Sequence, residues 1–132
     1  MISIDKALPL PNLSSLNSSQ IAIKVNPEGG FFAYLDFVQS HTLDHNDVKS
    51  GIDRLTQDFP VTNLSFSGWI GFFGYEFLAS HLGLNLQANR DLKIPDGWFG
   101  RPQTIIHLLP NQTKIESSLA QRAAEIGQTL EF

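Results

Sequence analysis

The sequence predicts an α+β fold with a largely antiparallel sheet packed by about three helices. Two observations lead to this prediction: β-branched runs are bounded by strong turn signals, and other segments repeat their apolar residues with the helical period. Strand and helix runs mixed in this way are typical of the α+β class. The chain has 132 residues, the length of one ordinary domain. We therefore expect residues 1–132 to form a single domain.

The first forty residues predict an arm followed by a hairpin. Residues 1–20 are rich in Pro, Ser and Asn and indicate an extended arm laid on the domain. Residues 21–25 are mostly β-branched and favour a strand, and residues 26–30 (Asn-Pro-Glu-Gly-Gly) are a strong turn signal. The apolar residues of 31–38 also fit a helical face. The clear turn before them favours the second strand of a hairpin.

A helix is expected over residues 47–59. Asp44 or Asn46 can cap its N-terminus, and Pro60 ends it. The apolar face of this helix consists of Val48, Ile52, Leu55 and Phe59.

Residues 65–73 are apolar on both alternating faces, which predicts a strand buried on both sides. After Gly74 the period becomes helical, and Gly83 is a natural stop. The face of this second helix consists of Tyr75, Leu78, Ala79 and Leu82.

The last third of the chain predicts a hairpin and a helix. Residues 84–97 are a polar excursion, 103–109 form a strand, and 113–116 return after a turn. Ser118 can cap a last helix. Its apolar face consists of Leu119, Ala123, Ile126 and Leu130.

Composition excludes several classes of function. The net charge of −4 lacks the basic footprint of a nucleic-acid binder or of a membrane-surface helix. The chain has no cysteine, which excludes disulfides and thiolate chemistry. Residues 1–6 do not resemble a signal peptide, and the apolar run 66–79 is too short to cross a bilayer. We expect a cytoplasmic protein with neither nucleic acid nor membrane as a partner.

The glycines and acids of the sequence do not form a recognisable phosphate-binding or catalytic motif. Gly68, Gly71 and Gly74 match no phosphate-binding spacing and lack a following Lys, so close packing of a strand is the favoured interpretation. Glu76, beside the aromatic run, is the one acid whose pKa the sequence predicts to be raised, but a Glu favoured at a helix N-terminus by the dipole is the alternative. No pair of carboxylates lies in an apolar setting, and no nucleophile elbow is present. The sequence predicts no catalytic residue.

A metal site is a further candidate. It consists of His41, Asp44, His45 and Asp47, which offer ligand atoms for zinc or a hard cation. A solvated loop that ends in a helix cap is the favoured interpretation. His107, within a strand, is more often a packed histidine than a ligand.

The order of motifs from Phe66 onward resembles one family. Phe66-Ser67-Gly68-Trp69-Ile70-Gly71-Phe72-Phe73-Gly74-Tyr75-Glu76 is followed by Ile94-Pro95-Asp96-Gly97-Trp98-Phe99-Gly100 and the strand Thr104-Ile105-Ile106-His107. This order resembles the N-terminal domain of the chorismate-utilising synthases, namely anthranilate synthase component I and para-aminobenzoate (aminodeoxychorismate) synthase component I. The resemblance covers about residues 45–117. Its signature packing positions are Gly68, Trp69, Gly71, Gly74, Tyr75, Pro95 and Asp96.

The resemblance implies a non-catalytic scaffold or regulatory domain in chorismate-to-aromatic-amine biosynthesis, in the folate or tryptophan pathway. In this family a catalytic domain that binds chorismate and magnesium lies C-terminal to the region, so this chain alone is expected to be inactive and without a cofactor. The implied partners are that domain and a glutamine amidotransferase subunit, with self-association through an exposed apolar face. The family's Leu-Glu-Ser motif has an echo, without the serine, in Leu35-Asp36-Phe37. It implies an effector pocket at Leu35 and Asp36.

The residues themselves also allow an alternative function. The chain would then be an independent small-ligand- or metal-binding module. Its site would use the aromatic residues around Trp69 and Tyr75, or the cluster from His41 to Asp47.

Overall fold

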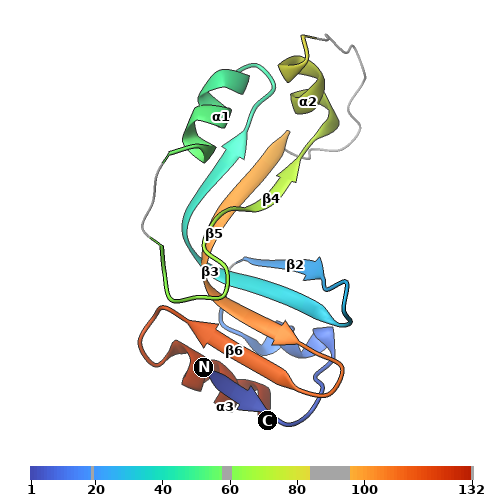
Figure 1. Ribbon diagram of the computed structural model, residues 1–132, viewed down its shortest axis with the longest axis vertical. Coiled ribbons are helices and arrows are strands. Elements are labelled where there is room, and N and C mark those ends of the chain that lie inside the picture. The colour runs from blue at the N-terminus through green and yellow to red at the C-terminus, as the bar shows by residue number, and fades with distance from the viewer. Residues whose placement is uncertain (19, 58–60, 84–95, 132) are drawn as a thin grey trace. The chain divides into compact units, whose positions relative to one another are not determined.

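The chain folds into two compact units (Figure 1). The computed structural model describes residues 1–18, 20–57, 61–83 and 96–131. Unit 1 comprises Met1–Val38, Val61–Gly68 and Pro102–Phe132, and unit 2 comprises Gln39–Pro60 and Trp69–Arg101.

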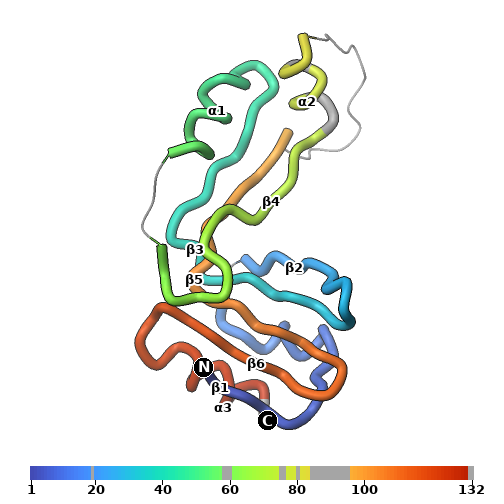
Figure 2. Tube along the Cα trace, viewed as in Figure 1, coloured from blue at the N-terminus to red at the C-terminus, as the bar shows by residue number. Residues whose placement is uncertain are grey.

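The α+β prediction is confirmed, with an antiparallel sheet and several helices. Among the described residues the sheet has the strand order β1 (Ile2–Ile4), β6 (Thr113–Ser117), β5 (Gly97–Leu108), β3 (Phe31–Leu43) and β2 (Ile21–Val25), and β4 (Ile70–Phe73) also pairs with β5 (Figure 2). The helices are η1 (Leu10–Ser15, a 3-10 helix), α1 (Val48–Leu55), α2 (Tyr75–His81) and α3 (Arg122–Glu131). None of these described helices has the length and apolar character needed to cross a membrane.

The predicted hairpin is confirmed, because β2 and β3 pair antiparallel from Ile21↔Leu35 to Val25↔Phe31. The helical interpretation of residues 31–38 is excluded. The turn closes through Asn26, whose N–H donates to the Gly30 carbonyl at 3.0 Å. Gly30 has a φ of +82°, a left-handed conformation that glycine adopts without strain. β3 continues to Leu43, beyond the expected end at residue 38.

The apolar core of unit 1 lies between its strands, η1 and α3. Residues 1–20, expected as an extended arm, contain β1 and η1, and they place Leu13 and Leu16 in the core. Each fully buried aliphatic side chain contributes about 1.5–3 kcal/mol of transfer free energy. The core consists of Ile4, Leu13, Leu16, Ala33, Leu35, Ile106, Leu108, Ile115, Ile126 and Leu130.

In unit 2, α1 lies close against Leu43 at the end of β3. A Cβ atom on Gly51 would lie 3.1 Å from a Leu43 methyl and 3.5 Å from the Phe77 ring, so the helix packs here through a residue without a side chain. The predicted cap of this helix is wrong. Asp44 accepts a hydrogen bond from the Asn46 N–H at 2.9 Å within the preceding turn, and the helix begins after Asp47. Residues 58–60, with the expected end of the helix, lie outside the described residues.

The prediction of a doubly buried strand over residues 65–73 is wrong. β4 spans Ile70–Phe73, pairs with β5, and exposes its last three residues. The pairing of β4 with β5 begins at Ile70, and the Ser65 N–H donates instead to the Glu116 carboxylate at 2.6 Å. Within the described residues β4 therefore pairs with β5 alone, and its apolar residues do not mark a strand buried on both sides.

Two further boundaries differ from the predictions. β5 begins at Gly97 rather than at residue 103, because pairing with β4 continues the strand towards its N-terminal end. α3 begins at Arg122 rather than after Ser118. The Ser118 N–H donates to the Gln103 carbonyl at 2.9 Å, which extends the β5–β6 pairing past the end of β6.

We expect Gly71→Ala to destabilise unit 2 by about 3 kcal/mol, because its new Cβ would lie 2.7 Å from the Phe99 Cα atom and closer still to the Trp98 carbonyl oxygen. Urea unfolding followed by tryptophan fluorescence measures this effect, since both tryptophans lie in unit 2.

Gly83→Ala is the matched control. Its Cβ would meet nothing within 4 Å, and its φ of +80° costs an L residue about 1–2 kcal/mol. Equal losses of stability in the two variants would contradict the assigned close approach of β4 to β5.

Candidate functional site

The glycine–aromatic segment forms a strand, a tight turn and a helix. At Gly71 and Gly74 the backbone approaches β5 so closely that a side chain would collide with the carbonyl oxygens of Trp98 and Asp96. The Gly74 N–H donates to the Asp96 carbonyl, and α2 begins at the next residue. At Gly68 a Cβ would lie 3.1 Å from the Phe66 ring. Pro95 and the side chain of Tyr75 lie outside the described part of the chain.

This same segment carries a group of exposed apolar side chains, which we call the β4–α2 apolar surface. Phe72 is 43% exposed and Leu82 is 74% exposed. Phe73 is partly anchored, because its ring stacks on Phe77 with centroids 5.5 Å apart and meets Phe99 at 4.8 Å. The surface consists of Phe72, Phe73, Leu78 and Leu82.

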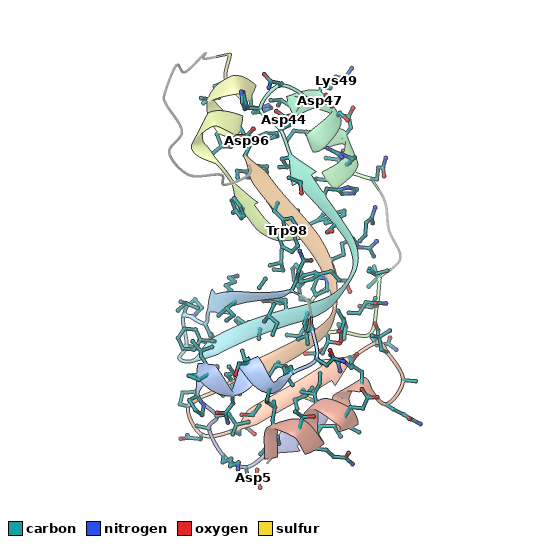
Figure 3. The ribbon with its side chains drawn as sticks, turned by 180° about the vertical axis from the view of Figure 1, so that it is seen from behind. Asp5, Asp44, Asp47, Lys49, Asp96 and Trp98 are labelled. Carbon is teal, nitrogen blue, oxygen red and sulfur yellow. The ribbon has the colours of Figure 1, made fainter. Side chains whose placement is uncertain are left out.

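The structure brings Asp44 and His45 together with Asp96, a residue that the sequence-based metal candidate did not contain (Figure 3). The His45 ring Nδ1 lies 2.6 Å from Asp96 Oδ2 and 3.8 Å from Asp44 Oδ1. One ligand atom from each residue lies within 4.8 Å of the others. Asp96 is 6% exposed, and its Oδ2 also accepts from the His45 backbone N–H at 2.6 Å.

His41 and Asp47, the other members of the predicted metal cluster, lie outside this group. His41 packs instead against Trp69, with ring centroids 5.3 Å apart. Its pKa is lowered by burial and by the positive charge of Arg54.

A pocket lies beside Asp36, one of the two residues of the effector pocket that the resemblance implies. A hollow of about 270 Å³ is lined by Asn17, Ser18, Gln20, Asp36 and Phe37. Leu35 does not line it, because its side chain is fully buried in the unit 1 core.

Asp36 is held firmly in place. The Arg122 guanidinium donates to both of its carboxylate oxygens, at 2.9 and 3.3 Å, and the Thr104 hydroxyl donates at 2.6 Å. The hydrogen bond to Asp36 and the negative charge of its carboxylate raise the pKa of Arg122. The φ of Asp36 is +56°, a left-handed conformation that is uncommon outside glycine and is enriched in Asp and Asn. A half-buried ion pair thus fixes an irregular backbone position at the pocket.

Sequence reasoning missed a second polar cluster in unit 1. The Glu116 carboxylate accepts from the Ser65 hydroxyl at 2.5 Å and lies 2.5 Å from His107 Nε2. Because Ser65 donates to the acid and not to the imidazole, this is not a nucleophile activated by a histidine base. Glu116 lies on β6, and its position in the sequence does not indicate that Ser65 and His107 are its partners. The cluster fixes the 61–68 segment to the sheet.

Comparison with known proteins gives no match to a family model, to a curated protein or to a solved structure. The class that the structure defines is an α+β protein.

We expect stability to fall in acid through Glu116. The hydrogen bonds from Ser65 and His107 lower its pKa below the ordinary value of 4.5, against the raising effect of its burial. The folded state therefore gives up this proton at a lower pH than the unfolded chain does. The resulting stabilisation is complete above pH 4.5 and is lost as the pH falls through the lowered pKa.

Glu116→Gln should cost about 1–3 kcal/mol at pH 7, and the difference from the native chain should shrink in acid. Glu28→Gln is the control, because Glu28 is exposed. Urea unfolding at pH 7 and at pH values below 4.5 tests the effect. A Glu116→Gln deficit that stays constant with pH would rule it out.

Proposed function

We propose that this chain acts as a non-catalytic scaffold or regulatory domain of a para-aminobenzoate or anthranilate synthase component I. In this role it packs against a chorismate-binding catalytic domain and helps to seat a glutamine amidotransferase subunit in the cytoplasm. The motif order from Phe66 to His107 is the basis for naming this family.

The observation that carries the docking role is the β4–α2 apolar surface. Single exposed apolar side chains are ordinary, whereas a concentration of them on one short segment supports docking there, even though Phe72 and Phe73, as successive strand residues, point to opposite faces of β4. Here Phe72, Phe73, Leu78 and Leu82 are each at least 39% exposed within eleven consecutive residues, 72–82. Exposing them to water is unfavourable, so a partner that covers them would gain free energy at roughly 25 cal/mol per Å².

The firm anchoring of these residues also supports docking. β4 is fixed by four pairs to β5, from Ile70↔Gly100 to Phe73↔Gly97, and Phe73 stacks on a fully buried Phe77. A surface that is already ordered loses little conformational entropy when it binds. The pocket beside Asp36 gives the regulatory part of the proposal a place for a small effector.

Binding in trans to a chorismate-binding catalytic domain of the family tests this proposal. Phe72→Ser should weaken the binding at least about tenfold, as truncation of a central aromatic residue in an interface does. Isothermal titration calorimetry measures the affinity. Sedimentation velocity should also show that the isolated chain self-associates less when Phe72 is replaced.

Ile23→Ser is the matched control for Phe72→Ser. Ile23 is 51% exposed but belongs to β2 in unit 1, so its replacement should leave the affinity unchanged. Equal effects of the two variants would contradict docking through β4–α2. Turnover of chorismate by this chain alone, with magnesium and ammonia, would contradict the non-catalytic role.

A metal-binding module is the second candidate function, and the group of Asp44, His45 and Asp96 favours it. One imidazole and two carboxylates form a ligand set that zinc accepts, with bonds of about 2.0–2.2 Å. Bonds of this length place tetrahedral ligand atoms roughly 3.4 Å apart. The 2.6 Å separation of His45 and Asp96 is instead that of a hydrogen bond, so binding would require His45 to lose its shared proton and the two atoms to separate.

Under this alternative, zinc should stabilise the chain by about 2.7 kcal/mol at a concentration one hundred times its dissociation constant. Asp44→Asn should abolish the effect while keeping the oxygen that accepts from the Asn46 N–H. Asp47→Asn is the matched control, since Asp47 is an exposed neighbour outside the group. Thermal unfolding with and without zinc measures this, and equal shifts in both variants would reject the site.

A further inference from the structure

We propose that Arg54 and Arg101, with the Trp69 indole beside Arg101, form a binding site for a small oxyanion, a carboxylate or a phosphate group, in unit 2. The site is separate from the β4–α2 apolar surface and does not depend on the proposed function.

The backbone register places these side chains on one face of the unit 2 strands. Gln39 and His41 lie on the same face of β3 as Leu43, the residue against which α1 packs. Ile70 pairs with Gly100, so Trp69 lies next to Arg101 one position further along. The distances agree: the Arg101 Cζ atom lies 5.9 Å from the centre of the Trp69 ring, and the His41 ring lies 5.3 Å from it.

A chain of hydrogen bonds orients the polar groups of this face. The Arg101 Nη1–H donates to Gln39 Oε1 at 3.3 Å, because a guanidinium can only donate. The Gln39 amide nitrogen must then donate to His41 Nε2, 3.2 Å away. His41 is therefore neutral here, with its hydrogen on Nδ1. The neutral imidazole therefore adds no further positive charge to this face.

Arg54 supplies the observation that points to an anion. It lies in α1, and its buried Nε atom has no hydrogen-bond partner among the residues that the structure describes. A buried donor without a partner costs about 1–3 kcal/mol, more for a charged group. The positive charge of Arg54 is also felt at His41, whose pKa it lowers together with burial. An anion at this position would complete the hydrogen bonding of Arg54.

The chemistry of the donors selects an oxyanion. A guanidinium presents N–H groups in a planar fork that fits the paired oxygens of a carboxylate or phosphate. The indole face gives the site an apolar wall, where charge-assisted hydrogen bonds are stronger than in bulk water. A simple halide would not use the fork, so chloride should compete poorly.

Fluorescence titration of the whole chain tests the inference. In a Trp98→Phe background Trp69 is the one remaining tryptophan, and sodium phosphate and sodium acetate are the probes, with sodium chloride at equal ionic strength as the blank. We expect a saturable change with at least one probe, and the tighter probe identifies the oxyanion. Arg54→Gln should weaken binding at least about tenfold, and Arg54→Lys, which keeps the charge, should weaken it less.

Lys49→Gln is the matched control, because Lys49 is an exposed cation on the same helix (Figure 3). It should change the affinity by no more than about twofold, the scale of a screened surface charge. By NMR, the pKa of His41 should rise when the probe binds, and also in unliganded Arg54→Gln. Equal weakening by Lys49→Gln and Arg54→Gln, or no saturable response to either probe, would overturn the site.

Discussion

The close approach of β4 to β5 is the constraint on which the candidate surfaces of unit 2 depend. Gly71 and Gly74 have no side chains, so the two backbones can pair at a separation that any Cβ atom would prevent. The register that results sets Trp69 beside Arg101, and it brings the Phe73 ring against Phe99, its diagonal neighbour on β5. The same glycines therefore position both the β4–α2 apolar surface and the wall of the proposed oxyanion site.

Asp96 links this strand pair to the end of β3. Its carbonyl accepts a hydrogen bond from the Gly74 N–H, just before α2. Its carboxylate accepts from the backbone N–H and from the ring Nδ1–H of His45. A carboxylate that is 6% exposed needs such partners, because burial without hydrogen bonds is costly. The cluster that resembles a metal site thus already satisfies a structural need. A cation would have to compete with hydrogen bonds that hold two segments together.

Sequence patterns predicted the fold class and the β2–β3 hairpin because these depend on local turn chemistry and on the spacing of apolar residues. They failed where a distant side chain decides the local structure. Residues 65–69 read as part of a strand, yet the Ser65 N–H donates to the Glu116 carboxylate. Asp96 joined Asp44 and His45 across a separation of 51 residues, which no local pattern contains. The sequence therefore predicted that histidine and aspartate would form the cluster, but it did not predict which residues would meet there.

The two units differ in how their described charges are satisfied, and this difference bears on where ligands bind. In unit 1 the half-buried Asp36 faces Arg122, and Glu116 faces His107 and Ser65, so each acid has its donors within the unit. In unit 2 the buried Nε of Arg54 has no acceptor among the described residues. A donor left unsatisfied by its own chain is held at a cost to stability that a bound acceptor would remove. The unsatisfied Nε of Arg54 is therefore the described charged donor that a bound anion would stabilise most.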